Sequence, residues 1–295
     1  MVELTLAGPS AFVQLSSVTM KQIFALTLVG SLSLLAASPV AAQQAPSPYR
    51  TRFAVDGPVI LAEGASSGFG LYRSMQRNGL SNTELAVLNK NDIPSFDRFS
   101  AGYYSETFQT AGDLLCYPTL AIAPGLLALN PAARGRYGQV VVLYLETVLA
   151  ADAFFTTAIG NIPRYRPYLY GPEGGDLRNG HIATNSFFAG HTAHTAAATF
   201  FAAKVFHDFN PDSRAQPYVW TAAALVPAVV AYTRIEAGKH FLSDNIVGYA
   251  VGATMGVVVP QLHKVAGRRG ISVVPLQGMN VNGYSYSGLL LSKQL

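Results

Sequence analysis

The sequence is poor in cysteine and in charged side chains, and each shortage excludes a class of protein. Cys116 is the single cysteine, so the chain can form neither an intramolecular disulfide nor a cysteine-based zinc site. Charged residues make up 12% of the 295 residues, and the formal net charge is only +4. No basic stripe interleaved with aromatic residues is present, which argues against nucleic acid as a partner.

Hydrophobic residues, by contrast, make up 50% of the chain. Apolar segments of helical length predict an all-α helical bundle that is membrane-embedded or membrane-associated. The expected helices cover residues 114–129, 137–160, 193–206, 216–233 and 245–262. The last two are the most like membrane spans. Glu146 and Asp152 interrupt the second segment, and we expect them to bond to neighbouring helices rather than to face lipid.

The N-terminus has the features of an export signal. Lys21 precedes an apolar run, and small residues at 40–42 offer a cleavage site before Gln43. Four segments are therefore expected: a signal peptide with an upstream extension (1–42), a leader with N-terminal helices (43–110), a helical core (111–265) and a tail (266–295).

Two local patterns refine this division. Ser81 and Glu84 stand three residues apart, as in a helix-capping box, whereas 57–72 is expected to be a packed helix and a poor membrane span. Alternating apolar and polar residues in the tail predict a small β-hairpin.

One segment, residues 233–244, concentrates the side chains that could do chemistry. It contains Arg234, His240 and Asp244. If the chain is helical from His240 onward, His240 and Asp244 lie on one face, and the carboxylate can accept the Nδ1 proton and leave Nε2 free to attack. The guanidinium of Arg234 matches a phosphate. The alternative is an ordinary helix start with a solvated arginine.

Two upstream segments favour the chemical interpretation. Gly190 and His191 precede an alanine-rich helix, where backbone N–H groups can bind an anion and the histidine can protonate a leaving oxygen. Arg164 and Arg166 add two guanidinium groups before Pro167. Antiparallel neighbouring helices would bring these segments to one end of the bundle, where they would form a phosphate pocket.

The order Arg166-Pro167, Gly190-His191-Thr192 and Arg234-x5-His240-x3-Asp244 resembles the type 2 phosphatidic acid phosphatase superfamily, which also holds bacterial acid phosphatases and vanadium haloperoxidases. The resemblance implies that His240 is the nucleophile, that Asp244 orients it and that His191 is the general acid. It further implies that the phosphate is held by Arg166, Arg234 and the Gly190 amide.

The sequence departs from the family pattern at two positions. The first motif of the family begins with a lysine where this chain has Ile159, and the second motif has a serine where this chain has Ala189. A charge-assisted contact contributes about 1.5–3 kcal/mol, so these losses matter for rate unless other groups replace them. Candidate replacements, chosen by proximity in sequence, are Arg164, Lys239 and Asn185.

The resulting prediction is a metal-independent phosphatase of the cell envelope that needs no cofactor. Its substrate would be a phosphomonoester or diphosphate of a small molecule or, in this apolar setting, of a lipid, with the pocket on the periplasmic side. Two alternatives stay open: a vanadium haloperoxidase-like enzyme, or a non-catalytic membrane protein that binds phosphate or lipid.

His191 and His194 are three residues apart, but a zinc site would need a third ligand, so we expect His194 to be structural. The sequence favours no particular oligomeric state.

Overall fold

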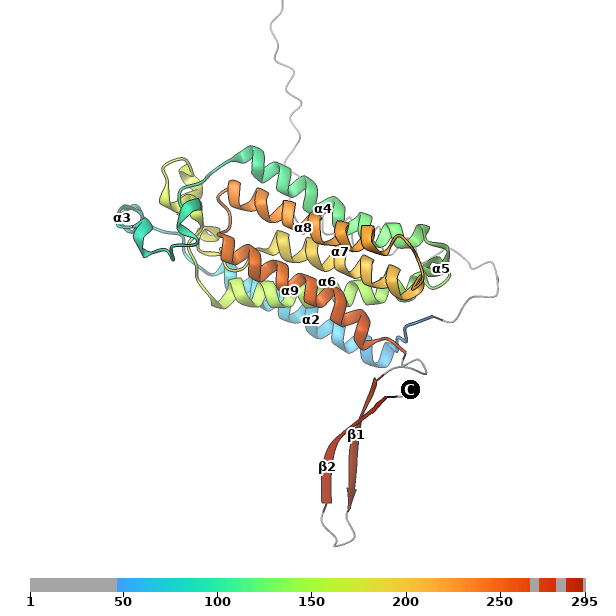
Figure 1. Cartoon of the computed structure of the whole chain (residues 1–295). Coiled ribbons are helices and arrows are strands. Elements are labelled where there is room, and N and C mark those ends of the chain that lie inside the picture. Colours follow the sequence, from blue (N-terminus) through green and yellow to red (C-terminus); the bar gives the residue numbers. More distant parts are fainter. Residues whose placement is uncertain (1–46, 266–270, 280–284, 294–295) are drawn as a thin grey trace, which may run out of the picture. The chain divides into compact units, whose positions relative to one another are not determined.

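The computed structural model describes residues 47–265, 271–279 and 285–293. Most of these residues form long helices that lie side by side (Figure 1). The long helices are α2 (Phe53–Met75), α4 (Glu106–Leu129), α6 (Tyr137–Asn161), α7 (Gly190–Phe209), α8 (Gln216–Glu236) and α9 (Leu242–Leu262). The short ones are α3 (Asn82–Ala86), η2 (Lys90–Asp92), η3 (Arg98–Ser100), α5 (Pro131–Arg134), η4 (Pro167–Tyr170), η5 (Gly175–Asn179) and η6 (His181–Thr184). The predicted all-α helical fold is confirmed.

Helix starts follow the local sequence. The Ser81 side chain accepts a hydrogen bond from the Glu84 N–H, and the Glu84 carboxylate accepts one from the Ser81 N–H, so the expected capping box is present. Ser105 caps α4 in the same manner through the Phe108 N–H. These contacts occur between near neighbours in the sequence, which is why pattern alone could predict them.

Helix α7 lies at the centre of the bundle, where it packs against α4, α6, α8 and α9. Its approach to α9 is close because three glycines, Gly248, Gly252 and Gly256, face the α7 backbone. A Cβ at Gly252 would lie 2.0 Å from the Ala193 carbonyl oxygen, so any larger side chain would push the two helices apart. This contact fixes the position of the start of α9 relative to the start of α7.

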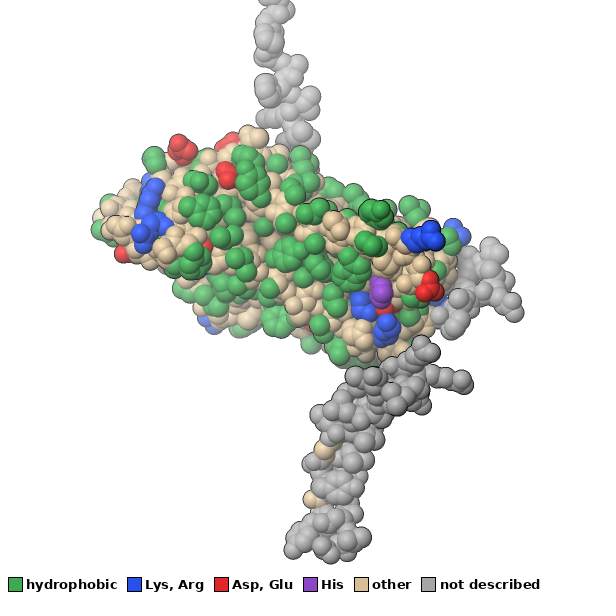
Figure 2. Space-filling model, in the orientation of Figure 1, with side chains coloured by type: hydrophobic (Ala, Val, Ile, Leu, Met, Phe, Trp, Pro, Cys, Tyr) green, Lys and Arg blue, Asp and Glu red, His purple; other side chains and the backbone are tan. Residues whose placement is uncertain are grey.

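The surface of the bundle supports a membrane location. Within the described part of the chain, four helices, α4, α6, α8 and α9, are long and apolar enough to cross a membrane. Large apolar side chains such as Leu126, Leu225 and Ile246 are more than half exposed. Figure 2 shows hydrophobic side chains spread over the middle of the visible face, while charged side chains gather toward its ends. In water such a surface would be costly to expose, whereas lipid tails would cover it.

The segments on either side of the helical core can also be compared with the sequence predictions. Helix α2 packs along α6, as expected for a packed helix, and it is not among the four candidate spans. The expected boundary at residue 110 falls inside α4. The tail contains the predicted antiparallel hairpin, β1 (Ile271–Met279) paired with β2 (Ser285–Lys293). The predicted signal peptide lies outside the described residues.

Candidate active site

Three segments that are far apart in the sequence meet at one end of the bundle. Arg166 Nη1 donates to the Lys239 carbonyl at 3.3 Å, which joins the segment before η4 to the turn between α8 and α9. The Ala189 N–H donates to the Asp244 carbonyl at 3.0 Å, which joins the start of α7 to the start of α9. Of the residues selected from the sequence, the structure therefore brings together Arg166, the Gly190 region and the 239–244 turn.

The turn between α8 and α9 depends on Gly238. This residue has φ +67, a conformation that side-chain-bearing residues rarely adopt. A Cβ here would also lie 1.8 Å from the Tyr103 carbonyl oxygen, so the 102–104 loop covers the turn closely. The tight turn sets the direction in which Lys239 and His240 leave α8.

His240 is almost fully buried, with 3% of its surface exposed. Its Nδ1 lies 2.7 Å from the Ser186 carbonyl oxygen, which can only accept, so Nδ1 carries the proton and Nε2 keeps a free lone pair. Burial, aided by the positive charges of Arg166 and Arg234, lowers the pKa of His240 well below its usual range. The imidazole is therefore neutral near pH 7 and has the tautomer that a nucleophile requires.

Asp244 does not make the contact expected from its spacing. Helix α9 begins at Leu242, so His240 and Asp244 do not share a helical face. The Asp244 carboxylate instead accepts from the Ser186 hydroxyl at 2.6 Å and from the Phe241 N–H at 2.9 Å. Asp244 therefore supports His240 indirectly: its carboxylate holds the Ser186 hydroxyl, and the Ser186 carbonyl accepts the hydrogen bond from His240 Nδ1. The expected direct His–Asp contact is thus replaced by an indirect one.

Arg164 is not available for phosphate, contrary to its selection as a replacement cation. Its Nη1 bonds to Asp244 and, at 2.8 Å, to the Ser243 hydroxyl. Its Nη2 donates to Asp97 at 2.6 Å, and the guanidinium lies over the Phe241 ring. Two buried carboxylates neutralise this arginine, so its role is to fix the start of α9. The sequence could not reveal Asp97, which lies 67 residues away from Arg164.

Asn185 is likewise occupied elsewhere. Its amide nitrogen donates to Ser74 at 2.7 Å, and its side-chain oxygen accepts from Arg77 at 3.1 Å. Of the two cationic candidates, Arg164 and Lys239, only Lys239 has no carboxylate partner among the described residues.

Lys239 and Arg166 supply positive charge beside His240. Lys239 is 5% exposed, and its ammonium lies over the Tyr104 and Tyr168 rings. Burial, together with the Arg166 and Arg234 charges, lowers the pKa of Lys239 to about 8. The guanidinium of Arg166 donates to the carbonyls of Ile182 and Asn185, which fixes its orientation. Arg166, Arg234 and Lys239 thus form a cationic cluster, and the charges of Arg166 and Arg234 also act on the nucleophile candidate.

Asp113 on α4 is a site residue that sequence reasoning missed. Its Oδ1 lies 2.9 Å from His191 Nε2 and 3.0 Å from Arg234 Nη1, so one carboxylate holds both the candidate acid and a candidate phosphate ligand. Arg234 is 4% exposed, and its Nε has no hydrogen-bond partner although it is buried. An unpaired buried donor on an arginine is costly unless an anion binds there. The signal in the sequence that could have identified Asp113 was a carboxylate that stands at the start of a long apolar helix.

The remaining predicted residues lie around this cluster. Gly190 and His191 form the first turn of α7, whose N–H groups have no acceptor within the helix. His194, one turn further along, pairs with Asp152 at 3.0 Å, in agreement with a structural role for both. A cavity of about 260 Å³ opens nearby and is lined by residues such as Tyr104, Glu173 and Glu236. None of the candidate catalytic residues lines this cavity. Tyr104 lines it and also contacts Lys239, so this tyrosine lies between the cavity and the cationic cluster.

Comparison with known proteins agrees with the motif assignment. Residues 141–268 match the family model of the PAP2 superfamily. A lipid A 4'-phosphatase from Porphyromonas gingivalis is 28% identical over 145 residues, a match that covers 44% of this chain and 55% of that protein. The chain thus spans about half the length of this curated relative.

A solved structure gives a further comparison. The crystal structure of a transmembrane PAP2-type phosphatidylglycerolphosphate phosphatase from Bacillus subtilis aligns with 82% of this chain and 94% of that chain, at 15% identity. Its TM-score is 0.36, too low to support an argument about the site. The family match, in contrast, contains Arg166, His191, Arg234, His240 and Asp244. Over residues 141–268, this chain is therefore similar to the type 2 phosphatidic acid phosphatase (PAP2) superfamily.

Proposed function

We propose that this chain is a phosphatase that hydrolyses a lipid phosphate through a phosphohistidine intermediate. The observation that carries the proposal is the His240 tautomer: Nδ1–H donates to the Ser186 carbonyl, Nε2 keeps its lone pair, and the charges of Arg166 and Arg234 act on the ring. A neutral imidazole surrounded by fixed cations suits attack on a phosphorus whose equatorial oxygens are negatively charged.

The proposed reaction has two steps. His240 Nε2 attacks phosphorus, the bond from phosphorus to the leaving oxygen breaks, and His191 gives that oxygen a proton. Water then attacks the phosphohistidine, gives its proton to His191 and releases phosphate as the N–P bond breaks. Asp113 accepts the Nε2–H of His191, so the proton that His191 gives in the first step and takes back in the second is the Nδ1 proton of its imidazolium form. Arg166, Arg234, Lys239 and the first N–H groups of α7 would hold the phosphate oxygens.

Both the substrate class and the side of the membrane need a test. The full chain in detergent should release phosphate from lipid phosphates, including lipid A phosphate, faster than from soluble phosphomonoesters, and release should survive EDTA at 20–25 °C. In intact cells, a short-chain lipid phosphate that does not cross membranes should be hydrolysed only if the pocket faces outward. Activity seen only after lysis would place the pocket in the cytoplasm. Phosphate binding without turnover would support the non-catalytic alternative, and vanadate-dependent halide oxidation the haloperoxidase one.

We further propose that Lys239 replaces the cation that is missing at Ile159. The pKa of Lys239 is about 8, so its ammonium is charged below this pH and is lost as the pH rises through it. We expect kcat/KM of the wild type to fall above about pH 8, and the Lys239→Arg variant to keep its activity to higher pH, because arginine stays protonated. The pH profiles of the two proteins should be measured on the same substrate. The ionisation of the substrate then affects both profiles equally, so a difference between them comes from residue 239. Identical alkaline limbs, or full activity in Lys239→Met, would contradict this role.

A further inference from the structure

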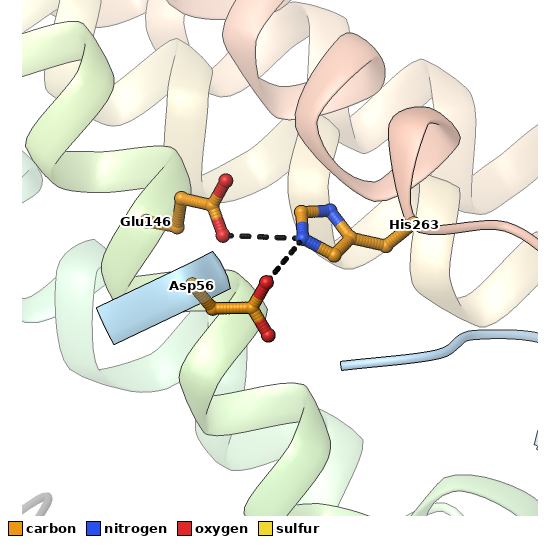
Figure 3. Close-up of side chains that lie close together, drawn as sticks. All are labelled: Asp56, Glu146 and His263. Carbon is orange, nitrogen blue, oxygen red and sulfur yellow. Dashed lines mark hydrogen bonds and ion pairs between the residues drawn. The ribbon is translucent and has the colours of Figure 1, made fainter. Parts of the chain in front are cut away.

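A second cluster of titratable side chains lies away from the candidate active site (Figure 3). Asp56 comes from the first turn of α2, Glu146 from α6 and His263 from the C-terminal cap of α9. His263 Nε2 lies 3.3 Å from Asp56 Oδ1 and 3.3 Å from Glu146 Oε2. Both carboxylates are buried, with 4% and 7% of their surfaces exposed.

The contacts of His263 direct one ring proton away from this cluster, and Nε2 lies at hydrogen-bond distance, 3.3 Å, from Asp56 Oδ1. Nδ1 lies 2.9 Å from the Val259 carbonyl oxygen, which can only accept, so Nδ1 carries a proton. In the neutral imidazole, Nε2 is then a lone pair that faces two carboxylate oxygens, as Figure 3 shows. The buried Glu146 Oε2 accepts no hydrogen bond. Three electron-pair donors thus converge on a space that calls for a cation.

The spacing and the supporting contacts fit a metal ion. Zinc binds His nitrogen and carboxylate oxygen at about 2.0–2.2 Å, and tetrahedral ligands at that distance are about 3.3–3.6 Å apart. The two measured separations of 3.3 Å agree with this geometry. The backbone carbonyl on Nδ1 is the usual partner of a metal-bound histidine, and the second oxygen of Asp56 is held by the Arg52 N–H at 2.6 Å. Mixed nitrogen and oxygen ligands favour zinc over magnesium or calcium.

We propose that Asp56, Glu146 and His263 form a structural Zn²⁺ site. Its ligands would join the start of α2, the body of α6 and the end of α9, three points that no short segment of chain connects. The 21 residues of α9 separate His263 from the His240 turn, about 30 Å along a helix. The ion is therefore too far away to take part in phosphate chemistry, and its effect is on stability. The competing interpretation is a protonated His263 paired with two carboxylates.

The test measures zinc content and thermal stability of the full chain in detergent. After exposure to Zn²⁺ and gel filtration, the wild type should retain about one zinc per chain. Free Zn²⁺ at about 100 times its Kd should raise the Tm by about 5–10 °C, and EDTA should reverse the gain. Phosphate release at 20–25 °C should be the same with and without EDTA.

Variants separate a metal site from an ion pair. Glu146→Gln and His263→Gln should lose the zinc and the Zn²⁺-dependent rise in Tm. His194→Gln is the matched control, because the His194–Asp152 pair has the same chemistry but no third ligand among the residues that the structure describes, and it should keep both. Unchanged zinc content in Glu146→Gln would overturn the proposal. So would a wild type that retains no zinc and shows no Tm change, a result that does not depend on any variant folding.

Discussion

Replacing His240 by alanine is expected to lower phosphate release by at least about 10³-fold, the scale on which loss of a catalytic nucleophile acts. The reason is that alanine removes Nε2, whose lone pair is set by the Nδ1–H bond to the Ser186 carbonyl. The loss should appear in kcat rather than in KM, because Arg166 and Arg234, the proposed phosphate ligands, remain. Lipid phosphate labelled with ³²P should give an acid-labile phosphoprotein in the wild type and none in the variant.

The control for this experiment is His181→Ala. His181 is exposed and lies in η6, so its loss should leave both phosphate release and labelling unchanged. Labelled protein that persists in His240→Ala would move the nucleophile to another residue. A lower Tm in His240→Ala with equal loss of activity in His181→Ala would point to a general effect on folding.

Asp113→Asn is expected to lower kcat/KM by about 10²–10⁴-fold, even though sequence patterns gave Asp113 no role. One oxygen of this carboxylate holds both His191 and Arg234. Charge-assisted hydrogen bonds contribute about 1.5–3 kcal/mol each, so the loss of two costs about 3–6 kcal/mol. A tenfold change in kcat/KM corresponds to about 1.4 kcal/mol, which gives the stated range. Asparagine keeps the shape but not the charge, so Arg234 would lose its counterion and His191 its orientation.

Asp152→Asn is the matched control for Asp113→Asn. Asp152 holds His194 from α6 much as Asp113 holds His191 from α4, yet it contacts no residue of the candidate site. We expect less than a tenfold change in kcat/KM for Asp152→Asn. Equal losses in the two variants, or full activity in Asp113→Asn, would contradict the role of Asp113. Thermal unfolding of both variants separates an effect on the site from an effect on stability.

Much of the fold was predictable because its elements are local. The apolar runs, the Ser81–Glu84 capping box and the alternating tail each specify an element within a few residues, and the helices and the hairpin follow these patterns. The spacing of the last motif likewise selected Arg234, His240 and Asp244 for a common site. The structure places them close together because α8 and α9 are joined by a short turn.

The tertiary structure decided which partner each of these side chains takes. Asp244 bonds to Ser186 instead of His240, and Arg164 bonds to Asp97 instead of remaining free for phosphate. Asp113 meets His191 across 78 residues.

The cluster proposed to bind zinc also joins residues that are far apart in the sequence, since Asp56 lies 207 residues before His263. Sequence by itself determined the helices and the family motif, because hydrophobic periodicity and capping act over a few residues. Partner choice depended on how the helices pack, since a buried charge takes whichever opposite charge the fold brings within reach.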